Sequence, residues 1–152
     1  MNLEDGFRAW FAHRRVNLLI GILFFALPLI FLSPGLSDFP YPSEQAKYSD
    51  FAITHYPNAL YLQRSLIECR CIPLWSPTIL SGYPFAANPL SGLWYPPVWL
   101  ALLFPLPLGL NLMTALHLSL GGWGMYRLLR VEGLRIEAAV LGGLGLDRKS
   151  VV

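Results

Sequence analysis

Charge is scarce in this chain, and its scarcity decides the class of protein. Asp, Glu, Lys and Arg make up 13% of the 152 residues, whereas hydrophobic residues make up 55%. Soluble domains carry about 25% charged residues. The formal net charge of +2 is too small for a basic nucleic-acid-binding surface. The composition therefore predicts a membrane protein, with the lipid bilayer and not a nucleic acid as its partner.

Signatures of soluble enzymes are missing too: there is no glycine-rich phosphate loop, no G-x-S-x-G and no H-E-x-x-H. The cysteines, Cys69 and Cys71, lie too close together for an easy mutual disulfide, and no further ligands complete a zinc site. We interpret both as structural. If their loop faces an oxidising compartment, a bond to another part of the protein is the alternative.

The first uncharged stretch runs from Val16 to Ser37, enough for one helix of about 20 residues across a bilayer. We place this span at about 16–36. Arg14 and Arg15 precede it, as in a signal peptide, but no small-residue cleavage pattern follows, which indicates an uncleaved anchor. By the positive-inside rule the amino terminus is cytoplasmic, so the chain after the span emerges on the outside.

A second uncharged stretch runs from Cys71 to Tyr126. Its first half is rich in proline, glycine and aromatic residues, which predicts an ordered loop on the membrane surface. The aromatic residues expected at headgroup level are Trp75, Tyr83, Trp94 and Tyr95.

Only 107–126 within this stretch is long enough for a second span. A basic cluster follows it, Arg127, Arg130 and Arg135, and this belongs in the cytoplasm only if a single crossing follows the first span. Residues 37–106 are then an extracytoplasmic loop, and 98–104 within it is re-entrant or interfacial.

The carboxyl end indicates an incomplete chain. Residues 136–146 begin like a further apolar span with small residues suited to close packing. Residues 147–152, DRKSVV, resemble the translation of a short-read sequencing adapter, and we interpret them as an assembly artefact; a genuine charged terminus is the alternative. We therefore treat 1–146 as the amino-terminal part of a multi-pass domain.

The outer loop contains a segment, 51–68, with apolar residues at helical spacing, which predicts an amphipathic helix starting between Phe51 and Pro57. Its apolar side is expected to face lipid and its polar side water. The apolar residues are Ala52, Ile53, Tyr56, Ala59, Leu60, Leu62, Leu66 and Ile67. The polar residues are Asp50, Thr54, Tyr61, Arg64 and Glu68.

Asp50 stands at or just before the start of this helix. One interpretation is a cap, with the carboxylate accepting backbone N–H bonds. The other is chemical: a general base, or a ligand for a divalent ion bridging to a phosphate. His55 is either a surface histidine or a functional one, which donates a hydrogen bond to a phosphate or takes up a proton. Arg64 pairs with Glu68 four residues on or receives a lipid phosphate.

The order of these features resembles the YfhO-like bacterial membrane proteins, multi-pass members of the GT-C glycosyltransferase superfamily, over roughly Val16 to Leu146. The most specific block is PLWSPTILSGYPFAANPLSGLWYPP. The residues that carry the resemblance there are Pro73, Leu74, Trp75, Pro77, Gly82, Pro84, Asn88, Pro89, Tyr95 and Pro96.

The resemblance implies an all-α membrane fold of GT-C type, with transmembrane helices and juxtamembrane helices in a long outer loop. It implies sugar transfer from a polyprenyl-phosphate-linked donor to a cell-envelope acceptor, on the outer face of the bacterial cytoplasmic membrane. Asp50 matches the catalytic aspartate, which in this superfamily also helps to bind a divalent metal ion. His55, Tyr56 and Arg64 are the expected substrate-binding residues. We expect these 152 residues alone to be inactive, because two spans and a loop cannot enclose a donor.

Two other functions fit the same residues. A transporter or lipid-handling protein would use Asp50 and His55 to gate a polar path, although transporters usually carry their charges at mid-membrane depth. A non-catalytic assembly protein would use neither.

The predicted orientation can be tested by labelling. A single cysteine introduced beside Asp50 should react with a membrane-impermeant maleimide in intact cells, because two arginine clusters hold the helix ends inside. Labelling only after the membrane is opened would show the opposite orientation.

Overall fold

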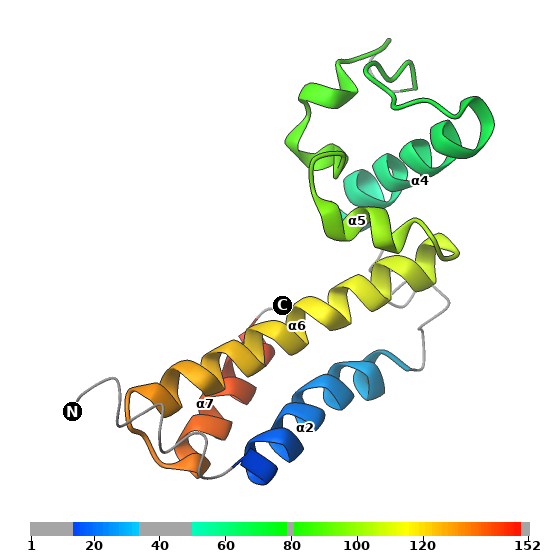
Figure 1. Cartoon of the computed structure of the whole chain (residues 1–152). Coiled ribbons are helices and arrows are strands. Elements are labelled where there is room, and N and C mark those ends of the chain that lie inside the picture. Colours follow the sequence, from blue (N-terminus) through cyan, green and yellow to red (C-terminus); the bar gives the residue numbers. More distant parts are fainter. Residues whose placement is uncertain (1–13, 34–49, 79–80, 150–152) are drawn as a thin grey trace. The chain divides into compact units, whose positions relative to one another are not determined.

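The computed structural model describes residues 14–33, 50–78 and 81–149, and this part of the chain is mostly helical (Figure 1). The α-helices are α2 (Arg14–Leu32), α4 (Tyr56–Arg64), α5 (Pro96–Ala101), α6 (Leu106–Val131) and α7 (Ile136–Lys149). The π-helical turns are η2 (Phe51–His55) and η3 (Ser65–Cys69), and the 3₁₀ turns are η4 (Phe85–Ala87) and η5 (Pro89–Ser91). No strand occurs in these ranges, where one isolated bridge joins Ser76 to Tyr83. The prediction of an all-α fold is confirmed for this part.

Among the described residues, one helix is long and apolar enough by itself to cross a membrane: α2, over Arg15–Leu32. Its side chains are mostly exposed, unlike those of a core helix in a soluble protein. The predicted second span, 107–126, lies within α6. α6 is long and apolar enough for a span only when it is taken together with Pro89–Ala101, and the two segments are bent by 92° relative to each other. Residues 37–49 and 150–152 of the predicted loop and terminus lie outside the described residues.

The chain divides into two compact units, 1–33 with 114–152 and 34–113. In the first unit Phe24 of α2 is buried where α6 and α7 carry glycines. A Cβ on Gly122 would lie 2.8 Å from Phe24 Cδ1, and one on Gly143 would lie 2.8 Å from the carbonyl oxygen of Gly122. Only glycine allows the backbones to approach this closely, which is how helices pack in lipid. Nearby, the hydroxyl of Tyr126 donates to Oδ1 of Asn17, and both side chains are buried.

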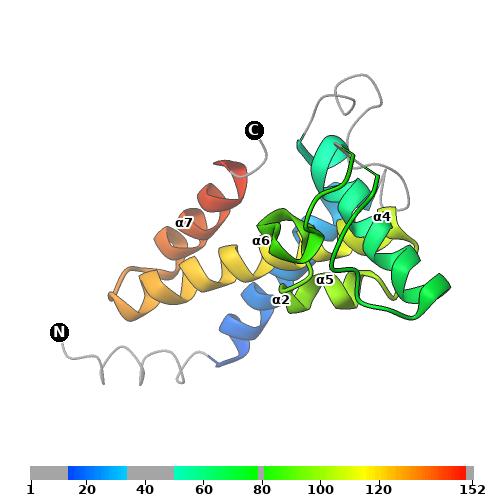
Figure 2. The ribbon, with the colours of Figure 1, turned by 90° about the horizontal axis from the view of Figure 1, so that it is seen from above.

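The second unit is built on a continuous helical segment from Phe51 to Cys69, which we call the loop helix (Figure 2). Two small clusters cover it. Ala59 packs with Ala101, Leu106 and Leu110. The other cluster joins Leu62 to Phe85, Leu93 and Val98.

Polar side chains hold the proline-rich segment onto the loop helix, because that segment lacks a regular backbone ladder. Tyr61 donates to the carbonyl of Trp75 at 2.9 Å, and Gln63 Nε2 donates to the carbonyls of Leu102 and Phe104 at 2.9 and 3.1 Å. Tyr83 donates to Asn58 Oδ1 at 2.8 Å, so its hydroxyl points inward and not toward headgroups as predicted.

The predicted division of the loop helix into a lipid side and a water side is wrong in part. Ala59 and Leu62 are buried by protein, whereas Ile53 and Ile67, expected on the same side, are 55% and 70% exposed. Tyr61, expected on the polar side, packs against the Leu62 cluster. The proline-rich segment, rather than lipid, covers the buried part.

The expectation that Cys69 and Cys71 lie too close together for a mutual disulfide is also wrong. Cys69 and Cys71 form a disulfide, with their Cα atoms 5.2 Å apart. Arg70 between them has a left-handed backbone, φ 52°. This bend turns the chain back at the end of the loop helix and brings the two Cα atoms within disulfide range.

The burial pattern predicts different costs for two similar substitutions on the loop helix. Leu62→Ala should lower the free energy of unfolding by about 2–5 kcal/mol, because it leaves a cavity in a closed cluster. Ile53→Ala, at an exposed site, should change it by about 0.5 kcal/mol or less. Denaturation of both variants in detergent measures the difference, and equal losses would contradict this packing.

Candidate functional site

The first turn of the loop helix is π-helical, and Pro57 explains why. The N–H of Tyr56 donates to the carbonyl of Phe51, five residues back. Pro57 has no N–H to donate to the carbonyl of Ile53, and its ring would crowd that carbonyl in a regular helix. The wider turn relieves both problems. Single π turns are rare in helices overall, and those that do occur are often found at functional sites.

Asp50 and His55 lie at the two ends of the π turn, and both side chains are exposed. They are five residues apart, the separation at which a π turn closes, whereas in a regular α-helix two such residues point about 140° apart. The wider turn therefore reduces the angle between them relative to α-helical periodicity.

Asp50 does not cap the helix. It has helical backbone angles, φ −55° and ψ −29°, and its side chain makes no capping hydrogen bond. The capping interpretation is therefore wrong, and the carboxylate is left facing solvent.

The turn η5 packs against both η2 and α4 and fixes the start of the loop helix. Asn58 Nδ2 donates to the carbonyl of Leu90 at 3.1 Å. Asn88 Oδ1 accepts from the N–H of Leu90 at 3.0 Å, which caps η5. Asn58 is almost fully buried. The sequence analysis did not identify Asn58 as a site residue. Its position beside Ala59 and Leu62, which are buried, could have indicated a buried amide that needs a hydrogen-bond partner.

The other predicted site residues are not all near Asp50. Tyr56 is half-buried, packs against the Ala59 cluster and lies with its ring 6.5 Å from that of Phe51, so much of it is structural. Arg64 is exposed but lies about 20 Å from Asp50 along the helix axis, at 1.5 Å per residue. Arg64 and Glu68 form no ion pair in the structure.

Metal ligands are few at this end of the helix. Within the described ranges no three His, Cys, Asp or Glu residues come together in a way that could hold an ion. Asp50 and His55 offer one carboxylate and one imidazole, fewer than a protein cage for a divalent ion requires.

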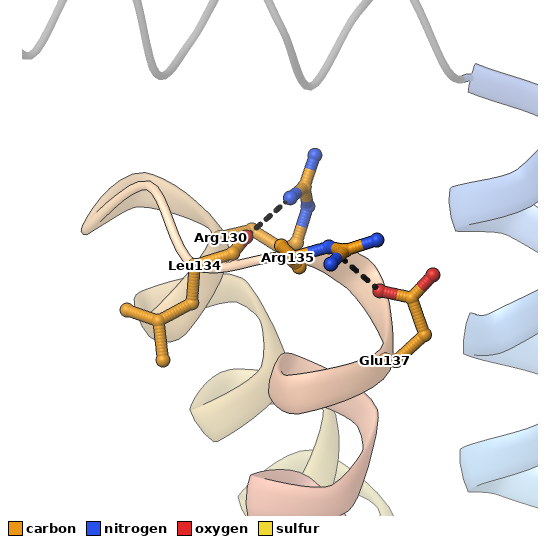
Figure 3. A network of polar contacts seen from close by, with 4 residues as sticks. All are labelled: Arg130, Leu134, Arg135 and Glu137. Atoms are coloured by element: carbon orange, nitrogen blue, oxygen red, sulfur yellow. Dashed lines mark hydrogen bonds and ion pairs between the residues drawn. The ribbon is translucent and has the colours of Figure 1, made fainter.

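The second basic cluster lies at the end of α6 in the other unit (Figure 3). Arg130 donates to the carbonyl of Leu134 and so closes the carboxyl end of the helix. Arg135 lies 3.7 Å from Glu137, with both side chains strongly exposed, a pair worth at most about 1 kcal/mol. These contacts are structural and leave Arg135 at the surface.

No family model, curated protein or solved structure matches this chain. The candidate site consists of the carboxylate of Asp50, which caps no helix, and the exposed imidazole of His55, both on the π turn. The buried amide of Asn58 holds the adjoining turn η5 in place.

Replacing Pro57 tests the origin of the π turn. Pro57→Ala restores an N–H that can donate to the carbonyl of Ile53, so the first turn should become α-helical. Nitroxide labels at positions 50 and 55 should then move apart, which weakens their dipolar broadening in an electron spin resonance spectrum. Unchanged broadening would show that Pro57 is not the cause.

Proposed function

We propose that this chain belongs to a membrane glycosyltransferase that acts on the outer face of a bacterial cytoplasmic membrane. The donor is a sugar linked to a polyprenyl phosphate, and the acceptor is a cell-envelope hydroxyl. The proposal is supported by the resemblance of the proline-rich block to GT-C proteins. The observation that carries it is the exposed carboxylate of Asp50, which caps no helix and stands five residues before the exposed His55 on a π turn.

In the proposed reaction Asp50 is the general base. Its carboxylate takes the proton of the acceptor hydroxyl as that oxygen bonds to the sugar's anomeric carbon. The bond from that carbon to the phosphate oxygen breaks, and the lipid phosphate leaves with the electron pair. His55 donates a hydrogen bond to the departing phosphate. A lipid-linked donor suits this place, since its chain stays in the bilayer while its phosphate remains at the surface.

Two earlier assignments change in this proposal. Arg64 is too far along the helix to touch the same phosphate, so it has no part in the chemical step. Tyr56 serves mainly to hold the π turn against the Ala59 cluster. The proposed reaction uses no metal ion, because no three His, Cys, Asp or Glu residues in the described ranges come together in a way that could hold one.

The test is a charge-removing substitution in the complete gene at its locus. Asp50→Asn should lower envelope glycan modification about 100-fold or more, the usual cost of losing a general base. Glu68→Gln is the matched control, because it removes an exposed carboxylate from the same helical segment and should leave modification unchanged.

Normal modification in an Asp50→Asn strain that expresses the protein at its usual level would remove the catalytic assignment. A transporter or a non-catalytic assembly protein would then be the better description.

A further inference from the structure

The bend between α5 and α6, residues 100–105, which we call the apolar corner, exposes three large apolar side chains within five consecutive residues. Leu103 is 77% exposed, Leu100 is 61% and Phe104 is 45%. Exposed apolar side chains that are grouped in this way are typical of surfaces that meet lipid or protein. From Cys71 to Tyr126, on both sides of this corner, no residue carries a formal charge.

Most backbone carbonyls of the corner accept hydrogen bonds inside the protein. Gln63 Nε2 donates to the carbonyl of Leu102 at 2.9 Å and to that of Phe104 at 3.1 Å. The carbonyls of Leu100 and Ala101 accept from Leu103 and Phe104. On a surface in water, solvent would satisfy these groups at no cost, and no buried or half-buried amide would be needed.

The backbone donors of the corner are reduced in number. Helices leave their first N–H groups unpaired, and proline removes such a group. Two prolines, Pro96 and Pro97, open α5, and two more, Pro105 and Pro107, flank the start of α6. The N–H of Gly109 donates to the carbonyl of Pro105 at 2.9 Å.

Gly109 makes the tight bend possible. A Cβ at this position would lie 2.0 Å from the carbonyl oxygen of Ala101. Any other residue would force α5 and α6 apart and open the hydrogen bonds of the corner.

We infer that the apolar corner is inserted into the hydrocarbon of the bilayer, with lipid acyl chains as its partner. Exposed apolar side chains, mostly paired carbonyls and missing N–H donors favour this position for a non-spanning segment, since lipid offers no hydrogen bonds. Gln63, a residue of the loop helix, satisfies two of the carbonyls of the corner. The inference does not depend on the proposed glycosyl transfer and would hold for any function of this chain.

Depth-dependent quenching tests the inference on the full chain in phosphatidylcholine vesicles. Cys69 and Cys71 are replaced by serine, and an NBD fluorophore is attached through Leu103→Cys. Its emission should be blue-shifted, and lipids with a nitroxide on the acyl chain should quench it more strongly than lipids with a nitroxide on the headgroup. Glu68→Cys is the matched control on the same unit and should show water-like emission.

Two results at position 103 would overturn the inference. Water-like emission would mean that the corner is in solvent. A blue-shifted emission that no lipid nitroxide quenches would mean that protein, for example a second copy of this chain, covers it.

A second variant examines Gln63 in the same vesicles. Gln63→Glu keeps the size of the side chain, but an ionised carboxylate cannot donate to the two carbonyls. At pH 8 the label at position 103 should become shallower and more strongly quenched from the headgroup region. An unchanged depth would contradict the pairing on which the inference rests.

Discussion

The second unit depends on hydrogen bonds from side chains of the loop helix to backbone carbonyls of a proline-rich segment whose helices are short. Prolines prevent long helices there, so η4, η5 and α5 are brief and many carbonyls need partners from elsewhere. Asn58 and Gln63 satisfy carbonyls at two separate places, Leu90 and the apolar corner. Each such bond stabilises only modestly in water, but an unpaired buried partner would cost about 1–3 kcal/mol.

Packing and polar pairing operate on the same face of the loop helix. Leu62 is fully buried between the two amides, and its cluster includes Phe85 and Val98 from the segment that the amides hold. The face is therefore occupied by protein, which leaves the first turn and the opposite side available for other roles. The π turn at Pro57 determines how Asp50 and His55 are presented from that first turn.

Helical periodicity was sufficient to predict the loop helix, but not the surroundings of its sides. Spacing showed which residues share a face and could not show that Ala59 and Leu62 would meet protein while Ile53 and Ile67 would not. That outcome depends on contacts with residues more than 20 positions away along the chain. Likewise, the π turn follows from a steric effect of Pro57 that a fixed period of 3.6 residues cannot represent, and the Cys69–Cys71 bond needs the left-handed backbone of Arg70.

The buried pair of Asn17 and Tyr126 in the first unit has a further consequence. Between two apolar helices, van der Waals contacts alone allow several axial registers of nearly equal energy. A single amide and phenol that meet at only one offset remove this degeneracy, because every other alignment leaves both buried groups without a hydrogen-bond partner. Together with the glycine contacts around Phe24, this pair selects one axial register of α2 against α6.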